Sequence, residues 1–241
     1  MTEPTERFYF RQLLAGRDFA LDDAVAGQMA NYCYLIGDRE RGEAVAVDPA
    51  YRVRELVDIL AADDLRLTDV LVTHYHPDHV GGDLGGWAIE GLSELLSTPG
   101  FSAKVHVQQE EASGVMRVTG LSESDLVRHR GGDVVTAGDI EITLVHTPGH
   151  TPGSQCFLVD GRLVSGDTLF LDGCGRTDLP GGDPAALYDS ITTLAALPDD
   201  TVLYPGHHYS PEDSATMAET RGRNIVFRPR TRDQWLMMFG N

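Results

Sequence analysis

The segment from 74 to 79 holds four side chains of types that bind metal ions, crowded into six positions. They are His74, His76, Asp78 and His79, in the run THYHPDHVGG. Zinc and iron accept imidazole nitrogen and carboxylate oxygen as ligands, whereas the packing of a protein core requires no such cluster. Because alternate residues on an extended loop point the same way, His74 and His76 can serve one metal while Asp78 and His79 serve a second.

Three further candidate ligands each follow an apolar run and are flanked by glycine or proline. They are His150 in TPGHTPGS, Asp167 in VSGDTLF and His207 in YPGHHY. Glycine lets the backbone turn sharply and approach a metal without a side chain in the way. We expect all seven side chains to converge on one or two metal positions. The other histidines are not expected to be ligands: His106, His129, His146 and His208.

Hydrophobic periodicity indicates the elements that must position these residues. Alternating or apolar runs predict strands at 8–14, 31–37, 43–49, 70–72, 104–107, 139–146, 156–159, 163–164 and 201–204. Helical spacing predicts helices at 53–60 and 184–197, with further candidates at 84–97 and 108–118. The order of strands, helix and strand occurs twice, which suggests two similar halves. Each group of candidate ligands then follows the end of a predicted strand.

Length and composition narrow the class of protein. The 241 residues can form a single domain over 1–241, in which residues 83–130 are expected to be an insertion that covers the pocket. No apolar stretch approaches the roughly 20 residues that span a bilayer, and the first residues do not resemble a signal peptide, so we expect a cytoplasmic protein. The formal net charge of −18 disfavours nucleic-acid and membrane partners. Three widely spaced cysteines indicate neither a disulfide framework nor a thiolate zinc site.

The order of these motifs resembles the metallo-β-lactamase superfamily, and the resemblance extends from about Tyr32 to Asn224. It implies an α/β fold, an αββα sandwich of two mixed sheets with outer helices, with the site where the strand-end loops meet. It also implies two ligand sets: His74, His76 and His150 for one metal, and Asp78, His79 and His207 for the other. Asp167 would bridge metals about 3.5–4 Å apart.

Within the superfamily the sequence is most similar to the glyoxalase II and persulfide dioxygenase branch. The runs YLIGDRERGEAVAVDPA, GCGRTDLPGG and WLMMFGN look like persulfide dioxygenases, whereas SGDTLF and HPDH look like small glyoxalase II-type hydrolases. Arg176 and Asp178 stand where the glyoxalase II enzymes have Lys and Tyr, so both are candidate substrate-binding residues. Arg176 would orient an anionic arm of the substrate. Cys174 can be read as a small buried apolar residue or as a redox-sensitive thiol near the pocket.

The function expected from this resemblance is hydrolysis of a small thioester, of the hydroxyacyl-thiol type, by a metal-bound hydroxide. Two zinc ions would lower the pKa of water and polarise the carbonyl, while Asp78 or Asp167 would manage the proton as the catalytic carboxylate. The alternative is an iron-dependent persulfide dioxygenase, in which the resemblance implies a single iron held through His74, His150 and Asp167. A non-catalytic binding domain is disfavoured because no ligand is missing. The expected partner is a small thiol-derived molecule, and a homo-oligomer is left open.

Overall fold

The computed structural model describes residues 7–98 and 102–240 and contains two six-stranded sheets and two small hairpins. The first sheet has the order β1 (Phe8–Leu14), β2 (Tyr32–Asp38), β3 (Glu43–Val47), β4 (Arg66–Leu71), β7 (Val105–Gln108) and β8 (Leu126–His129). The second has the order β16 (Ala215–Thr216), β15 (Val202–Pro205), β12 (Arg162–Gly166), β11 (Gln155–Val159), β10 (Ile140–His146) and β9 (Val134–Ala137). The hairpins pair β5 (Gly82–Leu84) with β6 (Trp87–Ile89) and β13 (Leu169–Phe170) with β14 (Gly173–Cys174).

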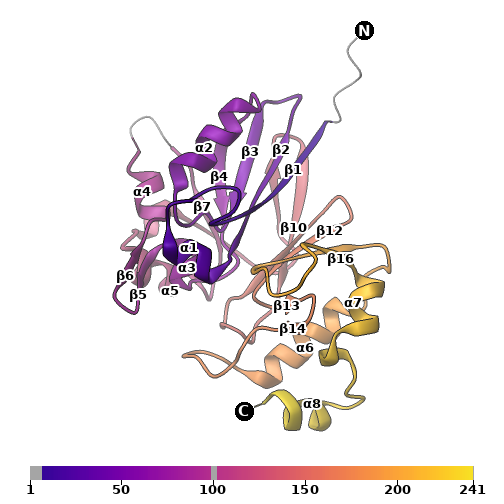
Figure 1. The fold of residues 1–241 in the computed structure, drawn as a ribbon. Coiled ribbons are helices and arrows are strands. Elements are labelled where there is room, and N and C mark those ends of the chain that lie inside the picture. The colour runs from indigo at the N-terminus through magenta and orange to yellow at the C-terminus, as the bar shows by residue number, and fades with distance from the viewer. Residues whose placement is uncertain (1–6, 99–101, 241) are drawn as a thin grey trace.

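Helices cover the outer faces of the paired sheets (Figure 1). On the side of the first sheet lie α1 (Ala24–Met29), α2 (Val53–Ala62), α3 (Pro77–Val80), α4 (Leu92–Leu96) and α5 (Ala112–Thr119). On the side of the second lie α6 (Pro184–Leu194), α7 (Met217–Arg223) and α8 (Arg232–Phe239). Short 3-10 turns occur at Glu123–Asp125 and Ile225–Phe227. Among the described residues, no helix has both the length and the apolar character needed to cross a lipid bilayer.

Three apolar clusters fill the interfaces between these layers. The cluster between the two sheets includes Ile36 and Phe157, both fully buried. The cluster outside the first sheet includes Leu60 of α2, and the cluster outside the second includes Ile191 of α6 and Trp235 of α8. Burial of apolar surface on both faces of each sheet stabilises a four-layer arrangement. The structure is therefore the αββα sandwich that the sequence predicts.

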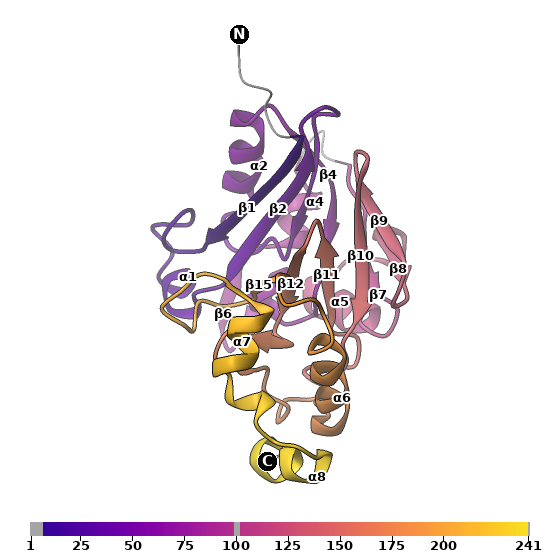
Figure 2. The same ribbon diagram turned by 90° about the vertical axis from the view of Figure 1, so that its right-hand side faces the viewer.

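The two halves of the chain repeat one arrangement of strands (Figure 2). In the first half, β3 is joined to the parallel strand β4 through α2, and in the second half β12 is joined to the parallel strand β15 through α6. Helix α6 begins where the sequence indicates, because Pro184 occupies its first turn and the Asp183 carboxylate accepts hydrogen bonds from two backbone amides of that turn. This repetition confirms the two similar halves expected from the sequence.

Residues 83–130 differ from the expectation of a pocket-covering insertion. Strands β7 and β8 belong to the first sheet, and Leu92, Leu95 and Val115 are buried in the cluster beneath its helices. The segment therefore contributes two strands to the first sheet and several side chains to its core. The helix predicted at 84–97 is wrong in its first half, because Gly85 and Gly86 adopt positive φ and turn the chain within the β5–β6 hairpin.

Candidate metal centre

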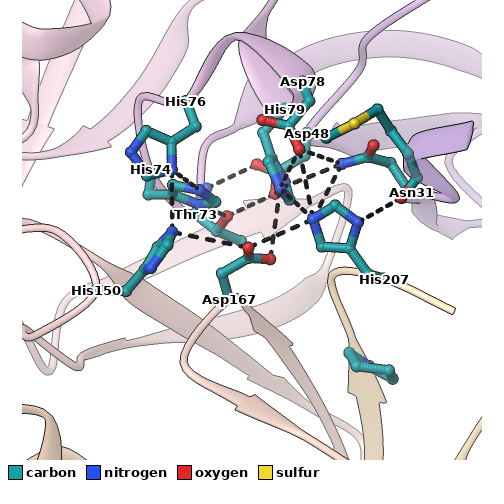
Figure 3. Close-up of polar contacts among 12 residues, drawn as sticks. Asn31, Asp48, Thr73, His74, His76, Asp78, His79, His150, Asp167 and His207 are labelled. Carbon is teal, nitrogen blue, oxygen red and sulfur yellow. Dashed lines mark hydrogen bonds and ion pairs between the residues drawn. The ribbon is translucent and has the colours of Figure 1, made fainter. Parts of the chain in front are cut away.

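The loops that follow four strands bring the seven candidate side chains together at one edge of the sandwich (Figure 3). After β4, the chain presents two histidines and then α3, which starts at Pro77 directly after the extended residue His76. The loops after β10, β12 and β15 each supply one more side chain. The seven residues, in chain order, are His74, His76, Asp78, His79, His150, Asp167 and His207.

Three imidazoles form a first group, which we call subsite 1: His74, His76 and His150. The Nε2 atom of His74 lies 3.1 Å from Nδ1 of His76, and Nε2 of His150 lies 3.0 Å from the same Nδ1 atom. Ligand nitrogens held about 2.0–2.1 Å from one metal in a tetrahedral arrangement lie roughly 3.3 Å apart. The spacing of subsite 1 is close to that required by a single ion.

A second group, subsite 2, consists of Asp78, His79 and His207. The Nε2 atoms of His79 and His207 are 3.2 Å apart, and Oδ2 of Asp78 lies 3.5 Å and 3.4 Å from them, respectively. Asp167 lies between the two subsites (Figure 3). Its Oδ2 atom is 3.3 Å from Nε2 of His207 and 3.7 Å from Nε2 of His150. One carboxylate therefore faces both groups.

Two features show that this donor set fits metal cations. In subsite 1 a single nitrogen, Nδ1 of His76, is within hydrogen-bond distance of two other ring nitrogens, although one nitrogen cannot satisfy both through one proton. The buried Oδ1 atom of Asp167 forms no hydrogen bond among the described residues, although it lies 3.4 Å from Nε2 of His79. Buried polar atoms normally have hydrogen-bond partners. Lone pairs of nitrogen and oxygen that point toward one another without such partners fit a bound cation.

Hydrogen bonds to groups outside the site orient three of the five histidines through their Nδ1 atoms. The Nδ1 atoms of His150 and His207 each lie near a backbone carbonyl oxygen, that of Arg176 at 2.7 Å and that of Met29 at 2.8 Å. The Nδ1 atom of His74 lies 3.0 Å from the Thr73 hydroxyl. A proton on each of these Nδ1 atoms leaves the lone pair of Nε2 directed into the site, as metal-binding histidines require.

Asp48, which the sequence analysis missed, supports both subsites from behind. Its Oδ2 atom accepts a hydrogen bond from the Thr73 hydroxyl and lies 3.0 Å from Nδ1 of His79. Its Oδ1 atom accepts a bond from the Thr73 amide at 2.7 Å. Thr73 in turn contacts His74, so a single carboxylate orients one histidine of each subsite. Asp48 directly follows β3 with a φ of 50°, a conformation that aspartate tolerates better than most residues.

Asn31 is a second buried residue that sequence reasoning missed. Its amide nitrogen donates to Oδ2 of Asp78 at 3.1 Å, and its amide oxygen accepts a hydrogen bond from the Tyr51 hydroxyl at 2.8 Å. An antiparallel backbone bridge between Asn31 and His207 holds it there and joins the residue before β2 to the loop after β15. The only signal in the sequence was its position immediately before a buried strand, which is too common to identify a site.

Burial and charge act differently on the two subsites. Burial, together with neighbouring imidazoles, lowers the pKa of His74 and lowers the pKa of His76 to about 4. Both rings are therefore neutral near pH 7 and their lone pairs are free to bind a cation. In subsite 2 burial acts in the same direction, but the carboxylates of Asp78 and Asp167 outweigh it and raise the pKa of His79 to about 10. The carboxylates thus favour positive charge at subsite 2.

A cavity of about 560 Å³ opens over the two subsites. Apolar side chains line much of it. The described lining residues are Met29, His76, Pro77, Asp78, Leu84, His150, Asp167, Phe170, Asp172, Gly173, Cys174, Arg176, Leu179, His207 and Tyr209. Arg176 is the only Lys or Arg among them. The guanidinium of Arg176 donates two hydrogen bonds of 2.6 Å to Asp178, which is not a lining residue. The charge of Arg176 is therefore already compensated.

Cys174 lines this cavity as an unpaired thiol. Burial raises its pKa to about 12, so the thiol is protonated near neutral pH. The reading of Cys174 as a small apolar residue is thus the better one, because oxidation and nucleophilic attack require a thiolate.

The other four histidines contact groups outside the seven. His106 and His129 lie against each other, with two ring nitrogens 2.8 Å apart. His208 contacts the Tyr32 hydroxyl, and His146 contacts the carbonyl of Pro152.

Comparison with known proteins identifies the family to which this site belongs. A family model described as the metallo-β-lactamase superfamily matches residues 26–207. The chain belongs to the metallo-β-lactamase superfamily. Two relatives are a probable polyketide biosynthesis zinc-dependent hydrolase, BaeB, of Bacillus velezensis and a hydroxyacylglutathione hydrolase of Aeromonas salmonicida. The first is 30% identical over 86% of each chain. The second is 36% identical over 75% of this chain, which spans 62% of that hydrolase's length.

Two solved structures are similar to this chain over most of its length. ETHE1 from Myxococcus xanthus is 32% identical, with a TM-score of 0.76 over 97% of this chain and 90% of its own. A di-iron-bound form of TTHA1623 is 27% identical, with a TM-score of 0.65 over 82% of this chain and 96% of its own. These relatives support the glyoxalase II and persulfide dioxygenase-like branch of the superfamily, whose members are metal-dependent enzymes.

Proposed function

We propose that this chain is a binuclear metallo-hydrolase that cleaves a small thioester, with two zinc ions as its cofactors. The observation that carries the proposal is the presence of two complete ligand groups, one on each side of Asp167. His74, His76 and His150 would hold one ion, whereas Asp78, His79 and His207 would hold the other. Relatives named as a zinc-dependent hydrolase and as hydroxyacylglutathione hydrolases support this assignment.

When bound, the metal pair would act as a Lewis acid on the thioester carbonyl and on the attacking water. The chain itself supplies acceptors for the proton that the water loses. Asp78 and Asp167 both lie at the cavity, and Asn31 holds Oδ2 of Asp78 through its amide. Either carboxylate can accept that proton and return it to the sulfur of the leaving thiol as the carbon–sulfur bond breaks. The products are a free thiol and a carboxylic acid, which ionises by releasing its proton to solvent.

The substrate would be small, because the cavity is compact and its walls are largely apolar. Relatives named as hydroxyacylglutathione hydrolases support a thiol-derived molecule. Met29, Phe170 and Leu179 would pack against the acyl group or the thiol arm. Arg176 could orient an anionic arm only if the arm displaced Asp178 from the guanidinium. Neutral arms therefore fit this pocket better than strongly anionic ones.

A persulfide dioxygenase is the second candidate function, and the similarity to the ETHE1 structure favours it. In that reaction an iron held by His74, His150 and Asp167 would let O₂ oxidise the terminal sulfur of a persulfide. Two histidines and one carboxylate on one face suit such iron chemistry.

The two functions can be separated by loading metal-free protein with Zn²⁺ or Fe²⁺ in parallel. Hydrolysis needs no electron transfer, so the proposal expects zinc to support cleavage of an S-lactoyl thioester in air and under nitrogen alike. Persulfide-dependent oxygen uptake with iron, without thioester cleavage by either metal, would establish the second candidate instead. If neither metal supports thioester cleavage and no oxygen is taken up, both candidate functions are contradicted.

A further inference from the structure

Glu111 is a buried carboxylate that lies outside both ligand groups yet touches the loops on which they are built. Its side chain is at the start of α5 and the residue is 1% exposed. Oε1 accepts hydrogen bonds from the Tyr75 amide at 2.7 Å and from the Thr151 hydroxyl at 2.9 Å. Oε2 accepts a bond from the Gly153 amide at 2.8 Å.

The partners of Glu111 are placed next to three ligands. Tyr75 lies between His74 and His76 in the chain, and Thr151 directly follows His150. All three of these histidines form subsite 1. One carboxylate therefore joins the loop after β4 to the loop after β10, at the positions where both loops supply imidazoles.

His76 gives this connection a particular importance. The other four site histidines have an outer ring nitrogen in contact with an oxygen atom, namely that of Thr73, Asp48, Arg176 or Met29. His76 instead directs Nδ1 into the site, and the described residues give its Nε2 atom no hydrogen-bond partner. The backbone on either side of that ring must then fix its position, and Glu111 holds the amide that precedes it.

We infer that Glu111 is a positioning residue that sets the geometry of subsite 1, and thereby its affinity for metal. The inference rests on the proposed metal binding at this site. Removing a hydrogen-bonding partner behind a metal ligand typically lowers metal affinity or activity about 10–100-fold. The effect should be selective, because Glu111 has no hydrogen bond to the loop that carries His207 or to the helix residues of subsite 2.

The decisive variant is Glu111→Gln, which keeps the size of the side chain but replaces one acceptor oxygen by an amide donor. That amide would face either the Gly153 amide or both the Tyr75 amide and the Thr151 hydroxyl, which all donate to Glu111, so at least one connection is lost. Metal-free wild-type and variant proteins are titrated with Zn²⁺ against a chromophoric chelator. A pH of 8 is suitable because it lies above the value of about 7 to which burial raises the pKa of Glu111. His76→Ala identifies the step that belongs to subsite 1.

We expect Glu111→Gln to weaken the subsite 1 step at least about tenfold while the subsite 2 step changes less than about threefold. Asp38→Asn is the matched control, because Asp38 is an equally buried hydrogen-bonded carboxylate at the other end of the sandwich. It should lower the free energy of unfolding without changing either binding step. Should Glu111→Gln fail to fold, Thr151→Val removes the hydroxyl contact to Glu111, together with a contact to Ser154, and should weaken subsite 1 in the same selective way.

Each failure has its own signature. A wild-type protein that binds no metal would contradict the proposed function itself. If the wild-type protein binds two ions and Glu111→Gln leaves the subsite 1 step unchanged, only the role of Glu111 is overturned. Equal weakening of both steps, or equal weakening by Asp38→Asn, would show that the effect follows general stability and would also overturn it.

Discussion

Asp48 is not a ligand, but it orients one histidine of each subsite. It contacts His79 directly and His74 through Thr73. Asp48→Asn should leave the backbone unchanged because asparagine tolerates the same left-handed conformation. Its amide would face donors, so we expect metal affinity to fall about 10–100-fold. Isothermal titration of metal-free protein measures this loss. Asp64→Asn, at another aspartate with positive φ, is the control, and equal affinity losses in the two variants would contradict the role of Asp48.

The ion pair of Arg176 and Asp178 makes a separate prediction about substrate charge. Asp178→Asn should free the guanidinium at the cavity and lower the KM for an anionic thioester, such as a glutathione ester, about twofold to fivefold. The KM for a neutral thioester of the same acyl group should not change. Asp160→Asn, which removes the ion pair of Arg162 at the β11–β12 turn, is the matched control. Steady-state kinetics at low salt would contradict the prediction if both thioesters responded equally.

The residues that could be predicted from the sequence are those whose type is unusual for their place. Packing and solubility rarely require histidines and aspartates to gather after apolar runs, so the seven that line the site stand out. Asn31 and Asp48 could not be found in this way because polar residues are ordinary at strand ends. Their role depends on the register of strands far apart in the chain. The pairing of Arg176 with Asp178 is local, but it depends on the conformation of their loop, which the sequence pattern does not encode.

At the scale of elements, the β5–β6 hairpin and α4 should behave differently although they are neighbours in the chain. Leu84 of the hairpin lines the cavity, whereas Leu95 of α4 is 1% exposed within the core. Leu84→Ala should change the KM for a thioester with little effect on stability. Leu95→Ala should lower the free energy of unfolding by about 2–5 kcal/mol and leave the KM unchanged. Urea denaturation and steady-state kinetics on both variants check this. A loss of stability in Leu84→Ala, or a changed KM in Leu95→Ala, would contradict the placement of Leu84 at the cavity and Leu95 in the core.

Elements with regular periodicity were predictable, and those formed by short segments were not. The strand predicted at 8–14 and the first turn of α6 at Pro184 are where the sequence places them. Strand β8 has only four residues and takes its place through parallel pairing with β7, which local sequence does not encode. The Gly85-Gly86 turn was readable as a hairpin signal, but the apolar residues around it also match helical spacing.

At the scale of the whole molecule, Asp38 links the two sheets at the end opposite the metal centre. Its carboxylate accepts hydrogen bonds from the Arg7 guanidinium and from the Asp139 amide in the β9–β10 turn. Arg7 holds the pKa of Asp38 well below its ordinary value of 3.8, although burial opposes this. The Asp38 carboxylate therefore binds a proton more readily in the unfolded chain than in the folded one. Its stabilisation of the fold is present above about pH 4 and is lost as the pH falls through and below that value.

Asp38→Asn should therefore lower the free energy of unfolding at pH 7 by about 1–3 kcal/mol and make stability less dependent on pH between about 2 and 5. Chemical denaturation across that range measures both effects. Glu123→Gln, in an exposed pair with Arg128, should have a much smaller effect. An unchanged acid dependence in Asp38→Asn would mean that other carboxylates govern acid unfolding.

The repetition of the two halves has a consequence for how the protein stays folded. Subsite 1 takes His74 and His76 from the first half and His150 from the second, and subsite 2 likewise combines Asp78 and His79 with His207. Each ion would thus be a cross-link between the halves. A ligand that binds only the folded state adds about 2.7 kcal/mol at a free concentration 100 times its dissociation constant. A chelator would then act on this sandwich as a reductant acts on a protein joined by disulfides.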